Sequence, residues 1–197
     1  MWAGTQKVRI LSFGAFPVDR TGFDGRVRER AGSSRPGILW LDDTQLASVA
    51  KAFSPDAFNI AFIHGGTEWS RTITPEQKRL YRELLQHGAD LVLGAHPHVL
   101  QAMEAADGKL IAYSLGNFLF PGMEGTPGGE DSIILRLGLY DGKIRYVQSF
   151  PVRLRGWMVR RASSEEAREE LLEQTRGVNA EPKSSIDGWQ KLAREGL

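Results

Sequence analysis

The sequence predicts an α/β fold with a parallel βαβ core and a C-terminal antiparallel hairpin. Residues 58–63 (FNIAFI) are an almost continuous apolar run, which is typical of a strand buried on both faces. Residues 74–88 show helical periodicity, and residues 90–94 (DLVLG) are a second apolar run, so the three segments form a strand, a crossover helix and a parallel strand. Residues 132–154 alternate on both sides of an Asp-Gly pair, which indicates a hairpin.

The crossover helix carries clear start and stop signals. Thr74 is a suitable N-cap, Pro75 fits the first helical position, and Gln77 completes a capping box. Gly88 supplies the C-terminal stop. His87 stands just before it, so we expect this histidine to interact with the helix dipole rather than with a metal.

The remaining elements of the main domain are predicted from shorter patterns. Residues 7–13 alternate and are rich in β-branched and aromatic side chains, which indicates a strand, and residues 109–115 indicate another. Residues 42–53 place apolar side chains on one helical face behind a pair of capping aspartates. Residues 14–40 are rich in Gly, Pro, Ser and Arg and predict a long loop, which usually indicates function or mobility.

The C-terminal part of the sequence predicts a separate helical segment. Helices are expected at about residues 164–175 and 184–195. We therefore assign residues 1–160 to one α/β domain and residues 161–197 to a helical extension. The chain of 197 residues is long enough for one substantial domain of this kind.

Composition narrows the partners and the chemistry. The formal net charge is +1, which gives no electrostatic case for nucleic acid or an anionic membrane as the main partner. The absence of cysteine excludes disulfides and thiolate metal sites, and it leaves the compartment open. The N-terminus lacks the pattern of a signal peptide, and no apolar run approaches the roughly 20 residues of a transmembrane helix.

Three of the four histidines follow the ends of the two core strands. His64 comes directly after residues 58–63, while His96 and His98 come after residues 90–94. Because parallel strands end at the same edge of a sheet, we expect these three side chains to lie together where open α/β sheets place their ligands. Neutral imidazoles in such a cluster favour a divalent metal such as Mn, Zn or Fe. Loop histidines with ordinary hydrogen bonds are the alternative.

The proline between two of these histidines restricts the backbone. Pro97 has a fixed φ and disfavours the helical region for the residue before it. The sequence therefore predicts an extended conformation for His96 and a partly preorganised pair of ligands.

Several motifs resemble those of a known protein family. HGGTEW at 64–69, HGADLVLGAHPHVLQAME at 87–104 and KLIAYSLGNFLF at 109–120 resemble, in this order, the bacterial capsule-synthesis CapA family, also described as poly-γ-glutamate synthesis proteins. The resemblance covers about residues 7–155. It implies a calcineurin-like metallophosphoesterase architecture, an α/β/β/α sandwich with two facing sheets and a two-metal site at strand ends, and a role at the cell envelope.

The resemblance also assigns roles to individual residues. It implies that His64 and His96 bind one metal and that His98 binds its neighbour. Glu68 matches an acidic residue expected in the wall of the site or in support of its ligands. Gly116 and Asn117 match a tight turn near the site, for which a purely structural role is equally expected.

The sequence departs from the family pattern in two places. Gly65 stands where the family motif has tryptophan, so a bulky wall is absent. Upstream Gly-Asp and Asn-Asn-His-x-x-Asp segments of the family are also absent, so the chain resembles the C-terminal half of such a domain. We therefore expect weak binding of a single metal, little activity by this chain alone, and an uncovered sheet edge that favours a homo-oligomer or exchange of segments between copies.

Three functions remain open at this level. The first is a metal-dependent hydrolase of phosphoesterase type in the synthesis of capsule or envelope polymer. The second is a non-catalytic envelope-assembly subunit that binds an acidic polymer such as polyglutamate through Arg153, Arg155 and Arg160. The third is a truncated reading frame without an independent role. A fold alone does not choose between them.

Overall fold

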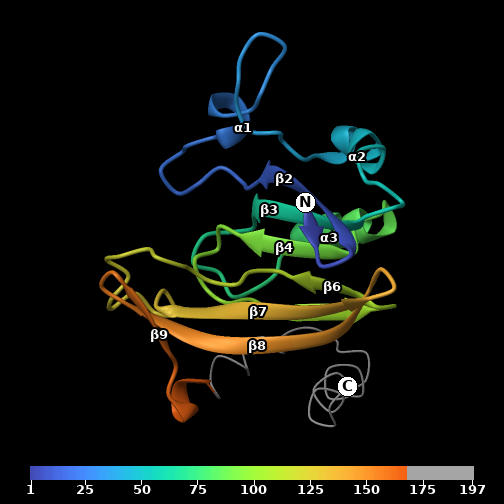
Figure 1. Cartoon of the computed structure of the whole chain (residues 1–197). Helices are drawn as coiled ribbons and strands as arrows, with labels where there is room; N and C mark the ends of the chain where they lie inside the picture. Colours follow the sequence, from blue (N-terminus) through green and yellow to red (C-terminus); the bar gives the residue numbers. More distant parts are fainter. Residues whose placement is uncertain (168–197) are drawn as a thin grey trace.

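Two sheets, three labelled helices and a helical turn at residues 164–167 make up the part of the chain that the structure describes. The computed structural model describes residues 1–167. The elements are labelled in Figure 1, except for the short strands β1 and β5. In chain order they are β1 (Trp2–Ala3), β2 (Gln6–Ala15), α1 (Gly25–Arg28), α2 (Asp43–Ala50), β3 (Phe58–Gly65), α3 (Pro75–Gln86), β4 (Leu91–Ala95), β5 (Met103–Ala106), β6 (Lys109–Ala112), β7 (Asp131–Tyr140), β8 (Lys143–Arg155) and β9 (Met158–Arg161).

The larger sheet contains the predicted parallel core. Its strand order is β1-β2-β3-β4-β6-β5, and β2, β3, β4 and β6 run parallel. The unit β3-α3-β4 confirms the predicted strand, crossover helix and strand. All four parallel strands end on the same side of the sheet, the left side in Figure 1. This edge is therefore common to the residues that follow each strand.

The smaller sheet confirms the predicted hairpin. Its order is β7-β8-β9, with all neighbours antiparallel. The β7–β8 turn is Asp141-Gly142, and both residues have positive φ, at 52° and 67°. Two positive φ values in succession match the right-handed twist of paired strands, which is why an Asp-Gly pair predicts a hairpin so well.

The two faces of the larger sheet have different covers. Helices α2 and α3 pack on one face, where Leu46, Leu80 and Leu84 contact a core built on Ala61 and Ile63. The smaller sheet covers the other face. Its core joins strands of both sheets through Phe58, Leu91, Leu110, Ile133 and Ile144. Residues 1–167 thus form a helix, sheet and sheet arrangement, which confirms a partial α/β domain.

Residues near the C-terminus fall partly outside this description. Residues 164–167 are helical, in agreement with the start of the helix predicted at 164–175. The remainder of that helix and the helix predicted at 184–195 lie outside the described residues. Residues 164–167 lie on the outer side of the smaller sheet (Figure 1), where Glu166 pairs with Arg153 of β8, and no other helix within residues 1–167 packs on that face.

The predicted N-caps are present, but the capping box of α3 is not closed, because the Gln77 side chain donates to Gln101 Oε1 and its own Oε1 accepts no hydrogen bond. The Thr74 hydroxyl accepts a hydrogen bond from the Gln77 backbone N–H at 3.1 Å, and Pro75 occupies the first helical position of α3. Asp42 caps α2 in the same way, accepting from the Thr44 backbone N–H at 3.0 Å. Residues 14–40 are mainly loop, as predicted, with α1 as their one helix.

Strand β2 has a partly open outer edge. Strand β1 pairs with it at Gln6 and Lys7, and residues 39–41 bond to it again at Gly14. The Met1 backbone also bonds to Val8, and between Val8 and Gly14 no described residue bonds to the outer edge through its backbone. Ile10 on β2 and Phe62 on β3 are 45% and 39% exposed, although they belong to the face that packs on the smaller sheet. The predicted uncovered edge is therefore present in the described part of the chain.

Candidate metal centre

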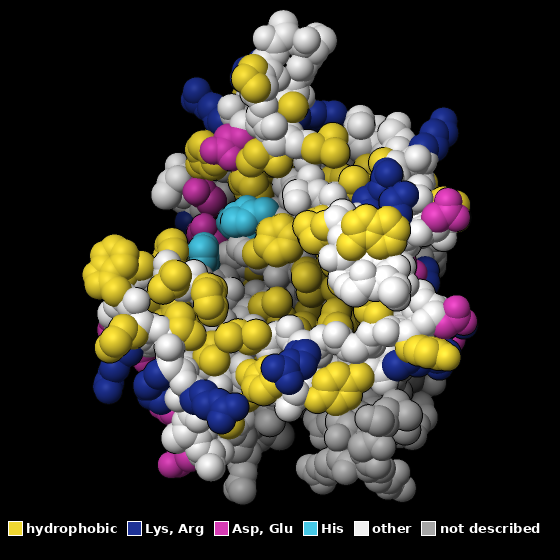
Figure 2. Space-filling model, viewed as in Figure 1, with side chains coloured by type: hydrophobic (Ala, Val, Ile, Leu, Met, Phe, Trp, Pro, Cys, Tyr) yellow, Lys and Arg dark blue, Asp and Glu magenta, His cyan; other side chains and the backbone are white. Residues whose placement is uncertain are grey.

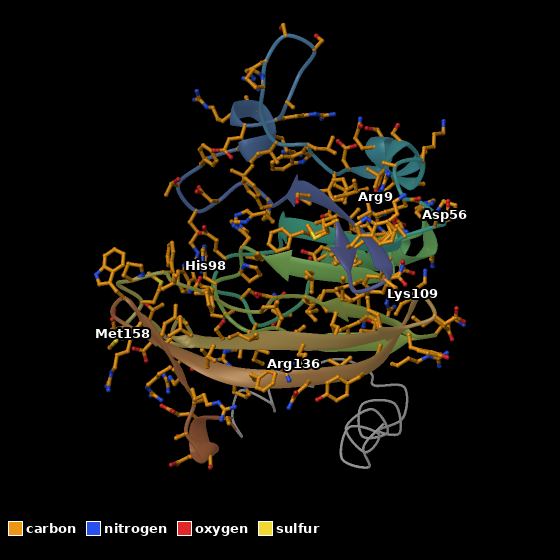
Figure 3. All side chains as sticks on the ribbon, in the orientation of Figure 1. Arg9, Asp56, His98, Lys109, Arg136 and Met158 are labelled. Atoms are coloured by element: carbon orange, nitrogen blue, oxygen red, sulfur yellow. The ribbon has the colours of Figure 1, made fainter. Side chains whose placement is uncertain are left out.

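The parallel strands bring the three predicted histidines to one edge. His64 lies near the end of β3 and is in register with Ala95, the last residue of β4, so His96 follows at the same level. His96 Nδ1 lies 3.0 Å from His64 Nε2, and the ring centres of His96 and His98 are 6.0 Å apart. Figure 3 labels His98 beside the strand ends, and Figure 2 shows the histidines grouped there. The convergence predicted from topology is confirmed.

A carboxylate completes the cluster. One ligand atom each from Glu68, His96 and His98 lie within 4.8 Å of one another. Among residues 1–167 this is the one such group of three or more histidine or acidic side chains. Glu68 was expected as a wall or supporting residue, and its position allows it to be a ligand itself. His64 stands outside this group of three and contacts it through the His96 ring.

Asn117 determines which nitrogen of His98 faces the cluster. The Asn117 amide N–H groups donate to the backbone carbonyls of His98 at 3.1 Å and Gly129 at 3.0 Å. The amide oxygen must therefore accept, and it lies 2.7 Å from His98 Nδ1. The proton of the neutral ring is consequently on Nδ1, which leaves the Nε2 lone pair free for a metal. Such a hydrogen bond is typical of metal-binding histidines.

Gly116 gives Asn117 its position. It has a φ of 76°, which favours glycine, and a Cβ at this position would collide with the backbone carbonyl oxygen of Asp131. The backbones of Gly116 and Asp131 approach closely, so the predicted tight turn needs glycine. The turn places the Asn117 side chain within hydrogen-bond distance of the His98 backbone carbonyl.

Aromatic rings enclose the histidines. Phe16 packs against His64 and His96, with ring centres 5.5 and 4.9 Å apart. Trp69 and Phe120 stack on His98 at 5.2 and 5.3 Å, with interplanar angles of 25° and 22°. These three aromatic residues were not predicted from the sequence to be part of the site. Only Trp69 and Phe120 lie in the motifs quoted above, and Phe16 lies in a long loop whose sequence gives no signal of where it folds back.

Backbone strain is concentrated at this site. The φ of His96 is 101°, so the predicted extended conformation is wrong. Proline disfavours the helical region before it, but this requirement does not force extended backbone. The chain reverses at His96 and brings its ring against His64 and Phe16. Trp69 and His98 also have positive φ, at 59° each, and such strain in non-glycine residues is characteristic of functional sites.

The histidines favour their neutral form. Burial and the neighbouring imidazoles of His64 and His98 lower the pKa of His96 to about 4. Burial, followed by His98, also lowers the pKa of His64. Metal ligation requires a neutral imidazole, so both rings are ready for a cation at neutral pH.

The same pKa shift predicts acid sensitivity of the metal-free protein. Because His96 binds a proton more readily when unfolded, the free energy of unfolding should fall as the pH decreases from about 7 to about 4. Urea unfolding at pH 7 and pH 5 with a chelator present measures this. His96→Asn should reduce the difference between the two pH values, whereas His87→Asn, at the exposed end of α3, should preserve it. An equal difference in wild type and His96→Asn would contradict the assignment.

The arginines proposed for polymer contact lie on strands β8 and β9 of the smaller sheet. Arg153 makes ion pairs with Glu130, Asp131 and Glu166, at 2.7, 3.4 and 3.2 Å. Arg160 pairs with Glu166 at 2.7 Å. Arg155 is exposed. The charges of Arg153 and Arg160 are thus largely balanced by carboxylates. Contact of Arg153, Arg155 and Arg160 with an acidic polymer stays a prediction.

A comparison with known families covers the strands and loops that form the cluster. The family model described as "Bacterial capsule synthesis protein PGA_cap" matches residues 3–122. The chain belongs to the PGA_cap family. The matched range includes His64, Glu68, His96, His98 and Asn117, whereas the arginines of the smaller sheet lie beyond it.

Two curated relatives share this region with the PGA_cap chain. It is 31% identical over 129 residues to "Capsule biosynthesis protein CapA" of Bacillus anthracis, covering 63% of this chain and 31% of the relative. It is 30% identical over 133 residues to "PGA biosynthesis protein CapA" of Bacillus subtilis (strain 168), covering 67% and 33%. A 68-residue stretch is 37% identical to the uncharacterized protein y4sH of Sinorhizobium fredii. The match spans about a third of the two CapA relatives.

Proposed function

We propose that this chain contributes a divalent-metal centre to a protein of capsule polymer synthesis, and that the centre serves a hydrolase reaction of phosphoesterase type. The observation that carries the proposal is the cluster of Glu68, His96 and His98 ligand atoms within 4.8 Å of one another. Capsule synthesis is supported by the family and by the names of the two CapA relatives.

The donor set suits a metal that is intermediate between hard and soft in its ligand preference. Two imidazoles and a carboxylate are ligands common to Zn, Mn and Fe sites. Asn117 directs the His98 Nε2 lone pair, and the lowered pKa of His96 keeps its ring neutral. A bound ion of this kind lowers the pKa of a coordinated water and polarises a phosphoryl oxygen. The side chains present therefore fit the cofactor.

The chain's own residues would hold the metal ion and limit the access of water to it. Glu68, His96 and His98 fix the ion at the carboxyl edge, and His64 supports the His96 ring from the side. Phe16, Trp69 and Phe120 restrict water around the histidines. Residues 1–167 offer one such ligand group, so we expect one ion per chain and weak hydrolysis by this chain alone.

Metal analysis tests the centre directly. Wild-type protein exchanged into zinc buffer should retain about one ion per chain, since three protein ligands plus water is a common zinc arrangement. His96→Ala and His98→Ala should each weaken zinc binding at least tenfold, because each removes a ligand. The matched control is His87→Ala, which changes the exposed histidine at the end of α3. Equal zinc content in His98→Ala and His87→Ala would refute the proposed centre.

Hydrolysis needs a separate measurement. Activity toward a generic aryl phosphate diester should depend on added metal and should disappear in Glu68→Gln, since the carboxylate belongs to the ligand group. Metal binding without any metal-dependent hydrolysis would instead favour the non-catalytic assembly role.

Self-association is proposed from the open edge of β2. Its unpaired backbone and the exposed side chains of Ile10 and Phe62 provide a surface on which a second strand can pair. We expect wild type to sediment as a dimer or larger species, and Phe62→Ser to shift it toward monomer. Thr5→Ser on the exposed β1–β2 turn is the control. Wild type sedimenting as a stable monomer at all concentrations would exclude this association.

A further inference from the structure

Five large apolar side chains are exposed at the tips of two loops. We call them the apolar ridge: Phe118, Leu119 and Phe120 from one loop, Trp157 from the β8–β9 turn, and Met158 from the start of β9. Their exposed fractions run from 44% for Phe120 to 78% for Trp157. Contiguous exposed apolar groups of this kind indicate an interaction surface.

The two loops are neighbours in space. The Gly156 backbone N–H donates to the Glu124 carboxylate, which joins the β8–β9 turn to the segment after Phe120. Both project at the left end of the molecule in Figure 1, and Figure 2 shows hydrophobic side chains protruding there with basic side chains directly below. Leu119 has a φ of 52°, an uncommon conformation for leucine that goes with its outward position.

The charge and the small size of the apolar ridge favour a membrane surface over a protein partner. Arg155 and Arg161 stand on either side of Trp157 and Met158 in the sequence, both are exposed, and neither makes an ion pair with a carboxylate among the described residues. Together with the backbone N–H groups of Glu124 and Gly156, Arg155 helps to lower the pKa of the Glu124 carboxyl. A stable protein interface uses roughly 20–30 residues on each side, far more than two loop tips offer. Tryptophan, phenylalanine and leucine beside arginine are instead the side chains that enter a membrane interface.

We propose that the apolar ridge docks the protein on the surface of a lipid bilayer, with Arg155 and Arg161 facing anionic headgroups. No helix in residues 1–167 is long and apolar enough to span a membrane, so this contact is peripheral. Because Phe120 stacks on His98, docking brings the histidine cluster close to the headgroups. The contact is independent of the metal centre, which survives if docking fails.

Co-sedimentation with vesicles tests the proposal. The full chain should bind vesicles of phosphatidylcholine with phosphatidylglycerol more tightly than vesicles of phosphatidylcholine alone. The double change Phe118→Ser with Trp157→Ser should weaken binding at least tenfold. The matched control is Trp2→Ser with Tyr140→Ser. These two aromatic residues are 69% and 74% exposed, and they lie at the opposite end of the two sheets.

Charge provides a second and independent variant. Arg155→Ala with Arg161→Ala should abolish the preference for phosphatidylglycerol and reduce the effect of salt, since surface charges are screened. Wild type remaining in the supernatant with both vesicle types overturns the proposal. So does an equal loss of binding in the Trp2 and Tyr140 control, or a ridge variant that changes self-association but not vesicle binding.

Discussion

Replacing Gly94 with alanine is expected to destabilise the protein by roughly 1–3 kcal/mol, the usual cost of a methyl group forced into a packed core. Gly94 is buried in β4, and a Cβ there would fall on the backbone carbonyl oxygen of Tyr113 and 3.0 Å from the Tyr81 ring. A backbone atom cannot rotate away as a side chain can. Strand β4 must therefore move away from its neighbour.

Urea unfolding of Gly94→Ala against Gly32→Ala measures this effect. Gly32 is exposed, its φ lies outside the left-handed region, and a Cβ there would meet nothing within 4 Å, so alanine should change stability by less than about 0.5 kcal/mol. Because His96 follows Gly94 by two residues, the shift should also weaken zinc binding. Similar unfolding midpoints for the two variants would show that β4 is not held against Tyr113.

Replacing Asn117 with alanine is expected to lower zinc affinity about 10- to 100-fold, the usual effect of losing the partner of a metal-binding histidine. The change removes the acceptor 2.7 Å from His98 Nδ1, so nothing keeps the proton on that nitrogen. It also leaves the carbonyls of His98 and Gly129 without their shared donor, which should cost roughly 1–3 kcal/mol of stability.

Asn117→Asp separates these two effects. A carboxylate still accepts from His98 Nδ1, but it cannot donate to the two carbonyls. We therefore expect Asn117→Asp to lose stability and to keep most of the zinc affinity. Competition with a chromophoric chelator measures the affinity, and urea unfolding measures the stability. Zinc affinity of Asn117→Ala equal to that of wild type would show that the His98 tautomer is not set by this residue.

The parallel core and the position of the histidines could be predicted from the sequence because each rests on a local signal. The apolar run at 58–63 and the capped helix after it require a crossover connection, and a crossover makes the strands parallel. Once the strands are parallel, His64 and His96 must share an edge. The short strands β1 and β5 were not predicted, because the two residues of β1 carry no measurable periodicity and the β5 sequence (MEAA) lacks β-branched and aromatic side chains.

Tertiary details of the site could not be predicted in the same way. The closeness of Glu68 to His96 and His98 depends on how the loop after β3 turns, and Trp69, with a positive φ, is part of that turn. The reversal at His96 depends on contacts with His64 and Phe16 that are distant in sequence. The apolar ridge could not be predicted from the composition either. A net charge of +1 does not show that Arg155 and Arg161 are exposed beside it.

The origin of the cluster in separate stretches of chain has a consequence for the order of assembly. Glu68, His98 and Asn117 follow different strands, and only the hydrogen-bonded sheet holds those strand ends at a common level. In the proposed metal centre an ion would therefore meet a finished scaffold and would not template it, unlike the ion of a zinc finger. Chelation should empty the centre while the far-ultraviolet circular dichroism stays unchanged.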